Sequence, residues 1–366
     1  MNPKKSVHES RKLVAVDLFS GGGGLTYGLR QAGFVVSAAV EIEREAAKTF
    51  IKNHPNTILF EGDIRTISGN QLKKTSPSGV IDLLAACPPC QGFSALTSKY
   101  GREDPRNQLV LDVRRLIEEI EPKVFMMENV PGLAVKGRSL LSEAMEPLRA
   151  MGYEIVSDVL EVADYGVPQR RRRLVVIGSR IGIINIPAQT HSRDASNGTA
   201  RWVTFKDALY PNKRGKPKEF GQLIKTEDPR DYNWHVTRTL SELNKQRLRA
   251  TKQGRSRASL PVELRPECHK HSNLGFSNVY GRMNLNSPAP TITGGCATLS
   301  KGRFGHPTSL RTISVREAAI LQSFPEEYIF DTRLIDRACG IIGNALPPLF
   351  AEKVAKHCLN HIQNYE

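Results

Sequence analysis

The stretch LVAVDLFSGGGGL, residues 13–25, decides the fold. Its apolar run over 13–19 predicts a buried strand, and the pattern over 24–32 predicts a helix that follows a glycine-rich turn. Glycines let the backbone approach a ligand closely, and a helix N-terminus favours negative groups. The same pattern also describes a tight turn with no ligand, so the turn alone does not decide a function.

Strand and helix patterns alternate over the next 160 residues. Apolar runs predict further strands at 35–41, 57–64, 81–86, 124–130, 154–161 and 173–178. Helical spacing predicts helices at 43–54, 107–121 and near 139–150. This alternation indicates an α/β fold, with an open and largely parallel sheet that carries helices on both faces.

Five polar or glycine-rich motifs follow directly on predicted strands: DLFSGGGG, VE, GDI, CPPCQGFS and ENV. Ligands of such sheets bind at the carboxyl ends of the strands, so we expect one composite site. Glu41 lies 24 residues after Asp17, which suits a carboxylate that accepts ribose hydroxyl hydrogens. Asp63 could accept from an adenine amino group, and Phe19 could stack on the ring. The glycine turn holds no basic residue, so a nucleoside with a small non-phosphate tail fits better than a polyphosphate.

The excess positive charge is concentrated in one third of the chain. The 366 residues carry a formal charge of +15, and residues 181–305 hold 21 Lys and Arg against 9 Asp and Glu. A polyanion is the expected partner of this segment, although a merely soluble basic surface would show the same excess. Apolar periodicity thins after residue 180, and loop-like stretches appear at 254–267 and 284–295. Helical patterns return at 314–325 and, after a turn, within 343–362.

Several features lead us to expect a cytoplasmic protein. No stretch of 18 uncharged apolar residues exists, so we expect no membrane span. The N-terminal residues 1–13 have no apolar signal core. The six cysteines are spread too widely for a disulfide framework, and free thiols agree with a reducing compartment.

The motif CPPCQGFS, residues 87–94, allows three interpretations. A structural zinc site would need two further ligands, and the cluster of Cys268, His269 and His271 is the available source. A thioredoxin-type redox pair would need a chain built around the motif. The third interpretation makes Cys90 a nucleophile.

The motifs together resemble one known family. DLFSGGGGL, VEIE, EGDI, PPCQGFS, ENVPG, VPQRRRR, SVREAAILQSFP and GNALPP occur in the order found in DNA (cytosine-5)-methyltransferases, over nearly the whole chain. The resemblance implies a Rossmann-like, S-adenosylmethionine-dependent methyltransferase sheet domain formed by residues 1–180 and 340–366. It also implies a second, smaller and irregular target-recognition domain at 181–339.

The resemblance assigns the chemistry of the reaction. A thiolate that adds to carbon 6 of cytosine makes carbon 5 enamine-like, and this role falls to Cys90. Cys87 stands where many relatives carry glycine, and we interpret it as a buried structural thiol. Glu128 is expected beside ring nitrogen 3, where a dry site would keep it partly neutral so that it can supply a proton or a hydrogen bond.

The run of four arginines in VPQRRRR, residues 167–173, has two interpretations. A charge run is usually a solvated face. The family pattern Gln-x-Arg-x-Arg instead maps onto Gln169, Arg171 and Arg173 as catalytic-site residues. It implies that Arg173 contacts the base carbonyl and that Arg171 supports the site and its backbone.

The implied cofactor is S-adenosylmethionine, and no metal is implied. The residues implied to bind this cofactor are Asp17, Phe19, Ser20, Gly21, Gly22, Gly24, Glu41, Ile42, Asp63, Ile64, Pro89, Leu109, Asn344 and Ala345.

The implied substrate is cytosine in a specific sequence of double-stranded DNA. The base has to be flipped out, and the loop 95–106 is expected to close over it. Base reading falls to residues 181–305, with RSR at 255–257, Asn278, Tyr280 and Arg282 as candidates. The compact chain is similar to prokaryotic methylases of restriction-modification systems, so we expect a monomer and a restriction endonuclease that acts separately.

Three alternative functions remain open. The same motifs serve enzymes that methylate cytosine in transfer RNA. A catalytically silent DNA-binding relative would lack the intact Cys90, Glu128 and Gln-x-Arg-x-Arg set. A nucleotide-dependent oxidoreductase would leave PPCQGFS and ENV unexplained.

Overall fold

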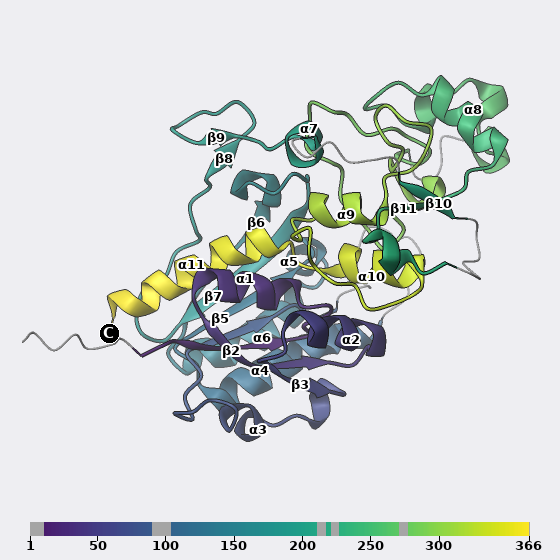
Figure 1. The fold of residues 1–366 in the computed structure, drawn as a ribbon. Coiled ribbons are helices and arrows are strands. Elements are labelled where there is room, and N and C mark those ends of the chain that lie inside the picture. The colour runs from purple at the N-terminus through teal and green to yellow at the C-terminus, as the bar shows by residue number, and fades with distance from the viewer. Residues whose placement is uncertain (1–10, 90–103, 211–216, 221–226, 271–276, 366) are drawn as a thin grey trace, which may run out of the picture.

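A seven-stranded sheet forms the centre of the molecule (Figure 1). The computed structural model describes residues 11–89, 104–210, 217–220, 227–270 and 277–365. The strand order is β3-β2-β1-β4-β5-β7-β6. The strands are β1 (Val14–Leu18), β2 (Val35–Glu41), β3 (Ile58–Glu61), β4 (Leu83–Ala86), β5 (Val124–Asn129), β6 (Glu154–Glu161) and β7 (Arg172–Ser179).

The prediction of a largely parallel sheet is confirmed. Strands β3, β2, β1, β4 and β5 pair in parallel. The apolar runs of β1, β2, β4 and β5 are buried because helices cover both faces, whereas β3 at the end of the sheet is partly exposed. Strand β7 enters antiparallel between β5 and β6, an arrangement that the sequence analysis did not anticipate. Its partner β6 precedes it in the chain and forms the outermost strand on this side of the sheet.

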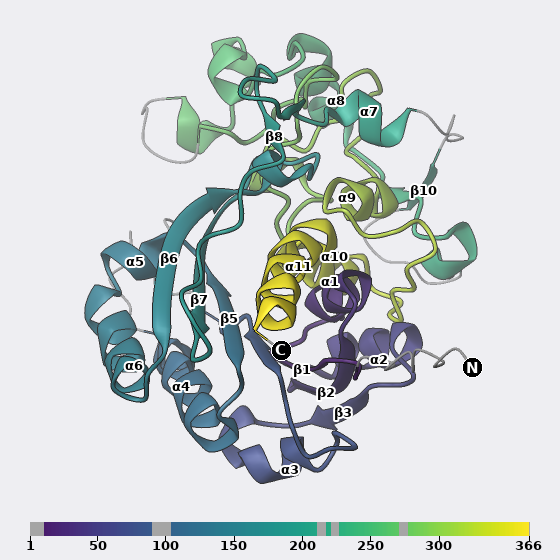
Figure 2. The ribbon, with the colours of Figure 1, turned by 90° about the vertical axis from the view of Figure 1, so that its left-hand side faces the viewer.

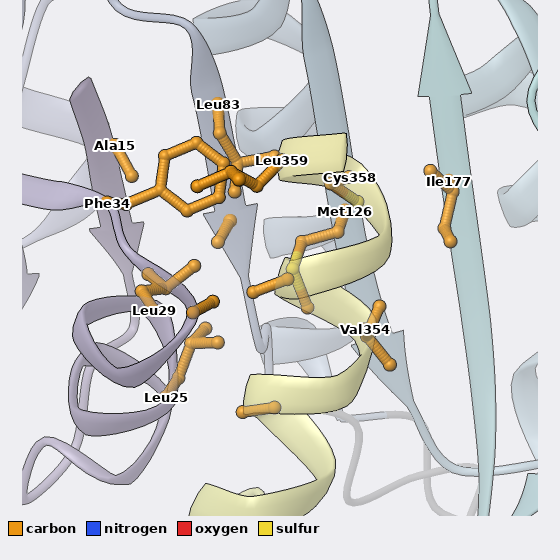
Figure 3. Close-up of a cluster of buried hydrophobic side chains, with 14 of the residues drawn as sticks. Ala15, Leu25, Leu29, Phe34, Leu83, Met126, Ile177, Val354, Cys358 and Leu359 are labelled. Carbon is orange, nitrogen blue, oxygen red and sulfur yellow. The ribbon is translucent and has the colours of Figure 1, made fainter. Parts of the chain in front are cut away.

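Helices cover the two faces of the sheet (Figure 2). On one face, α1 (Gly24–Ala32) and α11 (Pro348–Asn364) share a buried cluster with the strands, and part of it is drawn in Figure 3. On the other face, α4 (Leu109–Ile120) and α6 (Arg138–Ala150) pack against a second cluster. The helices α2 (Arg44–Asn53), α3 (Gly69–Lys73) and α5 (Gly132–Val135) complete this part. The predicted helices at 24–32, 43–54, 107–121 and 139–150 are confirmed.

The remainder of the described chain is irregular and lies beyond one edge of the sheet (Figure 1). Its elements are β8 (His191–Ser192), β9 (Ala200–Arg201), α7 (Phe205–Leu209), β10 (Lys218–Phe220), β11 (Val236–Arg238), α8 (Glu242–Ala250), α9 (Val315–Leu321) and α10 (Ile335–Asn344). They surround a third buried cluster that includes Trp234, and Ala46 of α2 also belongs to it. The predicted helix within 314–325 is confirmed as α9, whereas α10 was not predicted. The domain boundaries at 180 and 339 stay a prediction.

None of the helices in these described ranges is long and apolar enough to cross a membrane.

Candidate active site

Four neighbouring strands present a row of polar side chains on one face of the sheet. The strand register sets Leu18 beside Ala86 and Ala86 beside Met127, so Cys87 follows level with Glu128. Side chains alternate between faces along a strand, so residues two positions apart point to the same face. The residues two positions from Asp17, Cys87, Glu128 and Arg173 all belong to the first buried cluster: Ala15, Ala85, Met126 and Val175. Asp17, Cys87, Glu128 and Arg173 therefore share a face at the carboxyl ends of β1, β4 and β5 and the start of β7.

Glu128 and Arg173 form an ion pair in this row. The Arg173 Nε lies 2.5 Å from the Glu128 Oε1, and the two side chains are 13% and 11% exposed. Both residues come from motifs that the sequence analysis selected, and the antiparallel pairing of β5 with β7 brings them together. Burial strengthens such a pair because little water screens it. The arginine partner of Glu128 was not anticipated.

Cys87 lies within this row and is only half-buried, so its interpretation as a buried structural thiol is incomplete. Burial raises the pKa of the Cys87 thiol well above its usual value, and the charges of Glu128 and Asp17 and a hydrogen bond with Glu128 act in the same direction. A thiol with a raised pKa stays protonated and is a poor nucleophile. These surroundings argue against Cys87 as the nucleophile of the CPPC motif.

The position of Asn129 links the ENV motif to the CPPC segment. Its Nδ2 donates to the Pro88 carbonyl oxygen at 3.2 Å, two residues before the predicted nucleophile. Pro89 is half-buried. Cys90 lies outside the described residues, and so do residues 91–103, which include most of the predicted closing loop 95–106.

The four arginines of 170–173 alternate in exposure. Arg170 and Arg172 are exposed, Arg171 is buried and Arg173 is half-buried. The exposure of Arg170 and Arg172 agrees with a solvated face, whereas the catalytic-site roles of Arg171 and Arg173 stay a prediction. Arg170 lies over the Trp202 ring at 5.4 Å.

The side chains of Arg171 and Gln169 form hydrogen bonds with the backbone of other segments and do not face an open site. The Arg171 Nη1 donates to the carbonyl oxygens of Ile292 and Gly343, at 2.9 and 3.0 Å. Gln169 has no exposed surface, and its Oε1 accepts from the Ile292 amide at 2.8 Å. Its Nε2 donates to the Gln322 side chain. Both side chains thus bond to other parts of the chain, and the catalytic-site roles expected for Arg171 and Gln169 stay a prediction.

Carboxylates at two strand ends form hydrogen bonds with the glycine turn and with the helix that follows it. The Glu41 Oε2 accepts from the Gly21 amide at 2.7 Å, and its Oε1 accepts from the Glu43 amide at 2.7 Å. Asp17 accepts from the Thr26 hydroxyl at 2.6 Å, which joins β1 to α1. Burial raises the pKa of Asp17 to about 7, and the nearby Glu41 adds to this effect.

The C-terminal motif GNALPP lies against the glycine turn, as the resemblance implied. A Cβ placed on Gly24 would lie 2.9 Å from the Leu346 carbonyl oxygen and 3.3 Å from the Ala345 Cβ. Asn344, the last residue of α10, is exposed and Ala345 is half-buried. A cofactor held by the turn would therefore have these residues as neighbours.

The remaining predicted cofactor residues are arranged less uniformly. Phe19 is half-buried and has a φ of +62°, a strained value for a side chain of this size, which is common at functional sites. Ile42 is 69% exposed, whereas Ile64 is buried. Leu109 is half-buried at the start of α4.

Asp63 differs from its expected role as a free adenine acceptor. Its carboxylate accepts from the Arg65 amide and from the Arg65 Nε, both at 3.0 Å, and it caps a short helical turn that starts at Ile64. These hydrogen bonds with Arg65 lower the pKa of Asp63 to about 2. An adenine amino group would share this carboxylate with Arg65.

The residues around the turn fit S-adenosylmethionine. The Asp17 Oδ1 and the Ser20 Oγ are buried and have no hydrogen-bond partner among the described residues. Gly21 has a φ of +55°, and a Cβ placed there would meet nothing within 4 Å. Buried oxygens without partners beside open space suit a ligand with ammonium and hydroxyl donors. Within the ranges that the structure covers, no group of three or more His, Cys, Asp or Glu is placed to hold a metal ion.

The candidate residues for base reading differ in how far they are buried. Arg255 and Asn278 are exposed, whereas Arg257 is buried. Tyr280 packs its ring 4.8 Å from the Arg247 guanidinium. Arg282 is wrong as a candidate, because it is 6% exposed and donates to the carbonyl oxygens of residues 248, 306 and 309. Its guanidinium holds the fold of this segment together.

Sequence reasoning missed three residues that hold the site in place. Gln322 donates to the carbonyl oxygens of Ile342 and Ala345, both at 2.9 Å. His54 and Tyr328 contact the glycine turn. Each acts over a sequence separation of 20 to 306 residues, so no local pattern marks it. The position of Gln322 inside SVREAAILQSFP was the available signal.

Comparison with known proteins agrees with this geometry. The family of C-5 cytosine-specific DNA methylases matches residues 13–360. Type II methylase M.HgiDII of Herpetosiphon aurantiacus is 35% identical over 352 residues, which cover 93% of each chain. Type II methyltransferase M.XorII of Xanthomonas oryzae pv. oryzae is 33% identical, over 93% of this chain and 83% of its own.

Solved structures share the fold. An E. coli protein, described as a DNA modification methyltransferase encoded within a prophage, superimposes with a TM-score of 0.71 at 26% identity and covers 96% of this chain and 100% of its own. The Dnmt2 methyltransferase of S. pombe superimposes with a TM-score of 0.63 at 17% identity, over 96% of this chain and 100% of its own. The chain therefore belongs to the family of C-5 cytosine-specific DNA methylases.

Proposed function

We propose that this enzyme transfers a methyl group from S-adenosylmethionine to carbon 5 of cytosine in a specific sequence of double-stranded DNA. The observation that carries the proposal is the ion pair of Glu128 and Arg173, which stands at the sheet edge directly beside the CPPC segment. A carboxyl group can form a hydrogen bond with ring nitrogen 3 of a cytosine, and a guanidinium beside it can donate to the carbonyl oxygen of the same base. Membership of the methylase family supports the same reaction.

The glycine turn and its neighbours would hold the cofactor. Glu41 remains able to accept ribose hydroxyl hydrogens, because each of its oxygens has accepted one amide hydrogen and keeps a second lone pair. The buried Asp17 Oδ1 and Ser20 Oγ would accept from the polar tail. Phe19 and Ile42 would supply apolar surface to the adenine. When bound, the cofactor supplies an activated methyl group on a sulfonium.

The chain's own residues prepare the base. The Cys90 thiolate adds to carbon 6 of the cytosine, while Glu128 in its protonated form supplies a proton or a hydrogen bond to nitrogen 3 and takes the proton back when Cys90 leaves. Carbon 5 thereby becomes a nucleophile and accepts the methyl group. Loss of the carbon 5 proton then lets Cys90 leave, which restores the aromatic ring. Arg173, beside Glu128, would orient the base through its carbonyl.

The target base would be flipped out of the duplex, since carbon 6 is otherwise inaccessible to a thiol. The basic segment 181–305 would bind the phosphates, with exposed residues such as Arg255 and Asn278 in contact with DNA. The similarity to Type II methylases supports a protective role in a restriction-modification system, with the endonuclease acting separately. We propose that the enzyme acts as a monomer in the bacterial cytoplasm.

Replacement of the nucleophile tests this function. The Cys90→Ser variant should lose transfer of labelled methyl groups to duplex DNA and should still bind the cofactor. The matched control is Cys268→Ser, since Cys268 is exposed and free, and this variant should keep full activity. Bisulfite sequencing of DNA from an expressing host should show the modified carbon and the recognition sequence.

Two results would overturn the proposal. One is methylation that persists in Cys90→Ser, because the covalent step would then use another group. The other is labelling of transfer RNA with no labelling of duplex DNA. A 5-fluorocytosine duplex should in addition trap a covalent adduct with the wild-type protein and none with Cys90→Ser.

A further inference from the structure

Two side chains from distant parts of the chain form hydrogen bonds with carbonyl oxygens of the glycine turn. The Tyr328 hydroxyl lies 2.6 Å from the Gly22 carbonyl oxygen. The His54 Nε2 lies 3.1 Å from the Gly23 carbonyl oxygen and 3.0 Å from the Tyr328 hydroxyl. His54 follows α2 and Tyr328 follows α9, so the turn is held from two directions.

The hydrogen-bond partners fix the tautomer of His54. A carbonyl oxygen can only accept, so the Nε2 carries the hydrogen and donates to Gly23 and to the Tyr328 hydroxyl oxygen. The Tyr328 hydroxyl then donates to Gly22. The Nδ1 keeps its lone pair, which faces the Arg30 Nη1 at 3.4 Å. Burial and the Arg30 charge lower the pKa of His54 to about 4, so this neutral form is present at neutral pH.

The fit around the turn is tight. A Cβ placed on Gly23 would lie 2.4 Å from the His54 Nε2 and 2.7 Å from the Tyr328 hydroxyl oxygen. Gly23 also has a φ of +93°, a value that side chains rarely adopt. Gly23 is the N-cap of α1, so its position sets where the amides of this helix point. Tyr328 and His54 therefore contact the turn at the residue where α1 begins.

The segment that carries Tyr328 is itself anchored on both sides. The Arg316 Nη2 of α9 donates to the Tyr328 carbonyl oxygen at 2.8 Å. On the other side, Asn53 of α2 exchanges two hydrogen bonds with the backbone of Ile329, at 2.8 and 3.0 Å. Hydrogen bonds on both sides thus fix the backbone at Tyr328, and this backbone positions the Tyr328 hydroxyl at the turn.

We propose that Tyr328 and His54 are positioning residues for the cofactor, which hold the Gly22–Gly23 turn in the conformation that binds S-adenosylmethionine. The proposal rests on the proposed function, because it deepens the account of the same site. The two residues act through the turn and need not touch the ligand. Their removal should therefore weaken cofactor binding and leave DNA binding and the chemical step unchanged.

The test compares Tyr328→Phe with wild type. The variant keeps the ring packing and loses one hydrogen bond of about 1 kcal/mol, so the cofactor Kd should rise about fivefold to tenfold. Calorimetric titration of the protein alone with S-adenosylmethionine measures this Kd. Steady-state kinetics should show a matching rise of the cofactor KM, with unchanged kcat at saturating cofactor and unchanged KM for DNA. His54→Phe, which keeps a ring beside Phe50, should shift the same constants in the same direction.

The matched control is Tyr232→Phe. The Tyr232 hydroxyl donates to the exposed Glu227 carboxylate at 3.1 Å and lies far from the glycine turn in the chain, so this variant should match wild type. A variant that merely folds less well would lose kcat without a change of cofactor Kd. An unchanged Kd in Tyr328→Phe, with wild type binding normally, overturns this proposal alone. A wild-type protein that does not bind the cofactor overturns the proposed function together with it.

Discussion

The surroundings of Asp17 change the pKa of its carboxyl group. It has no exposed surface, and only its Oδ2 has a partner, the Thr26 hydroxyl. Burial disfavours the charged carboxylate, which is why the pKa is raised to about 7. The sequence marks Asp17 because it closes an apolar run before four glycines, but its burial follows from α1, which packs over it.

This burial predicts an unusual dependence of stability on pH. In the unfolded chain Asp17 ionises near 3.8, whereas in the folded protein it keeps its proton up to about pH 7. The folded state therefore binds more protons in this window, and its free energy of unfolding falls as pH rises. Relative to Asp17→Asn, the wild type should lose stability by about 4 kcal/mol between pH 4 and pH 7. Above about pH 7 the difference should level off.

Urea unfolding of both proteins at several pH values measures this difference. Asp17→Asn is a close mimic, because its carbonyl oxygen can still accept from the Thr26 hydroxyl. A difference in unfolding free energy that stays constant from pH 4 to pH 8 would show that Asp17 is ionised throughout.

At the scale of elements, the contact of α1 with α11 positions the glycine turn. The two helices cross at Gly28, where a Cβ would lie 2.5 Å from the Ala351 Cβ and 2.6 Å from the Pro348 carbonyl oxygen. The missing side chain lets the helix backbones approach closely, and the buried cluster of Figure 3 forms around this contact. The end of α1 that starts at the turn is thereby held against the last helix of the chain.

Two glycine substitutions separate helix propensity from packing. In an open helix position, Gly→Ala stabilises by about 1 kcal/mol. At Gly28 the new methyl group would meet backbone of α11, so Gly28→Ala should instead destabilise by about 2 kcal/mol. The matched control is Gly340→Ala in α10, where a Cβ meets nothing within 4 Å, and we expect this variant to be at least as stable as wild type. Chemical denaturation measures both, and a stabilised Gly28→Ala would contradict the close helix contact.

At the scale of the whole molecule, charge and chemistry occupy different parts of the chain. The sheet and its helices hold the candidate site, whereas the irregular part from residue 181 to 305 holds most of the excess of 15 positive charges. Phosphate contacts release counterions, so the affinity of such a surface for DNA depends on salt. The cofactor site depends instead on buried hydrogen bonds and packing, which salt screens weakly.

Salt should therefore separate the two binding reactions. If the basic segment neutralises about six or more phosphates, the affinity for a duplex should fall roughly a thousandfold between 50 and 200 mM salt. The cofactor Kd should change little over the same range. Fluorescence anisotropy with a labelled duplex and calorimetry with the cofactor measure the two constants. A duplex affinity that does not respond to salt would contradict a phosphate-binding role for the segment.

The sequence by itself determined the strands, most helices and the family. Buried strands need continuous apolar runs and helices need periodic ones, so local patterns predict these elements. The strand ends then locate the site, since a parallel sheet brings the ends of its strands to one edge. For this reason Glu41 and Glu128 could be selected from their strand ends, whereas Arg173 was selected through its match to the family pattern Gln-x-Arg-x-Arg.

Only the tertiary structure decided how these groups are supported. The insertion of β7 between β5 and β6 sets Arg173 against Glu128, and the strand register places Cys87 in the same row. The contacts of Tyr328 with Gly22 and of Gln169 with Gln322 join residues 306 and 153 positions apart. Such contacts leave no local signal, because a side chain that packs against a distant segment obeys the geometry of the whole fold and not the pattern of its neighbours in sequence.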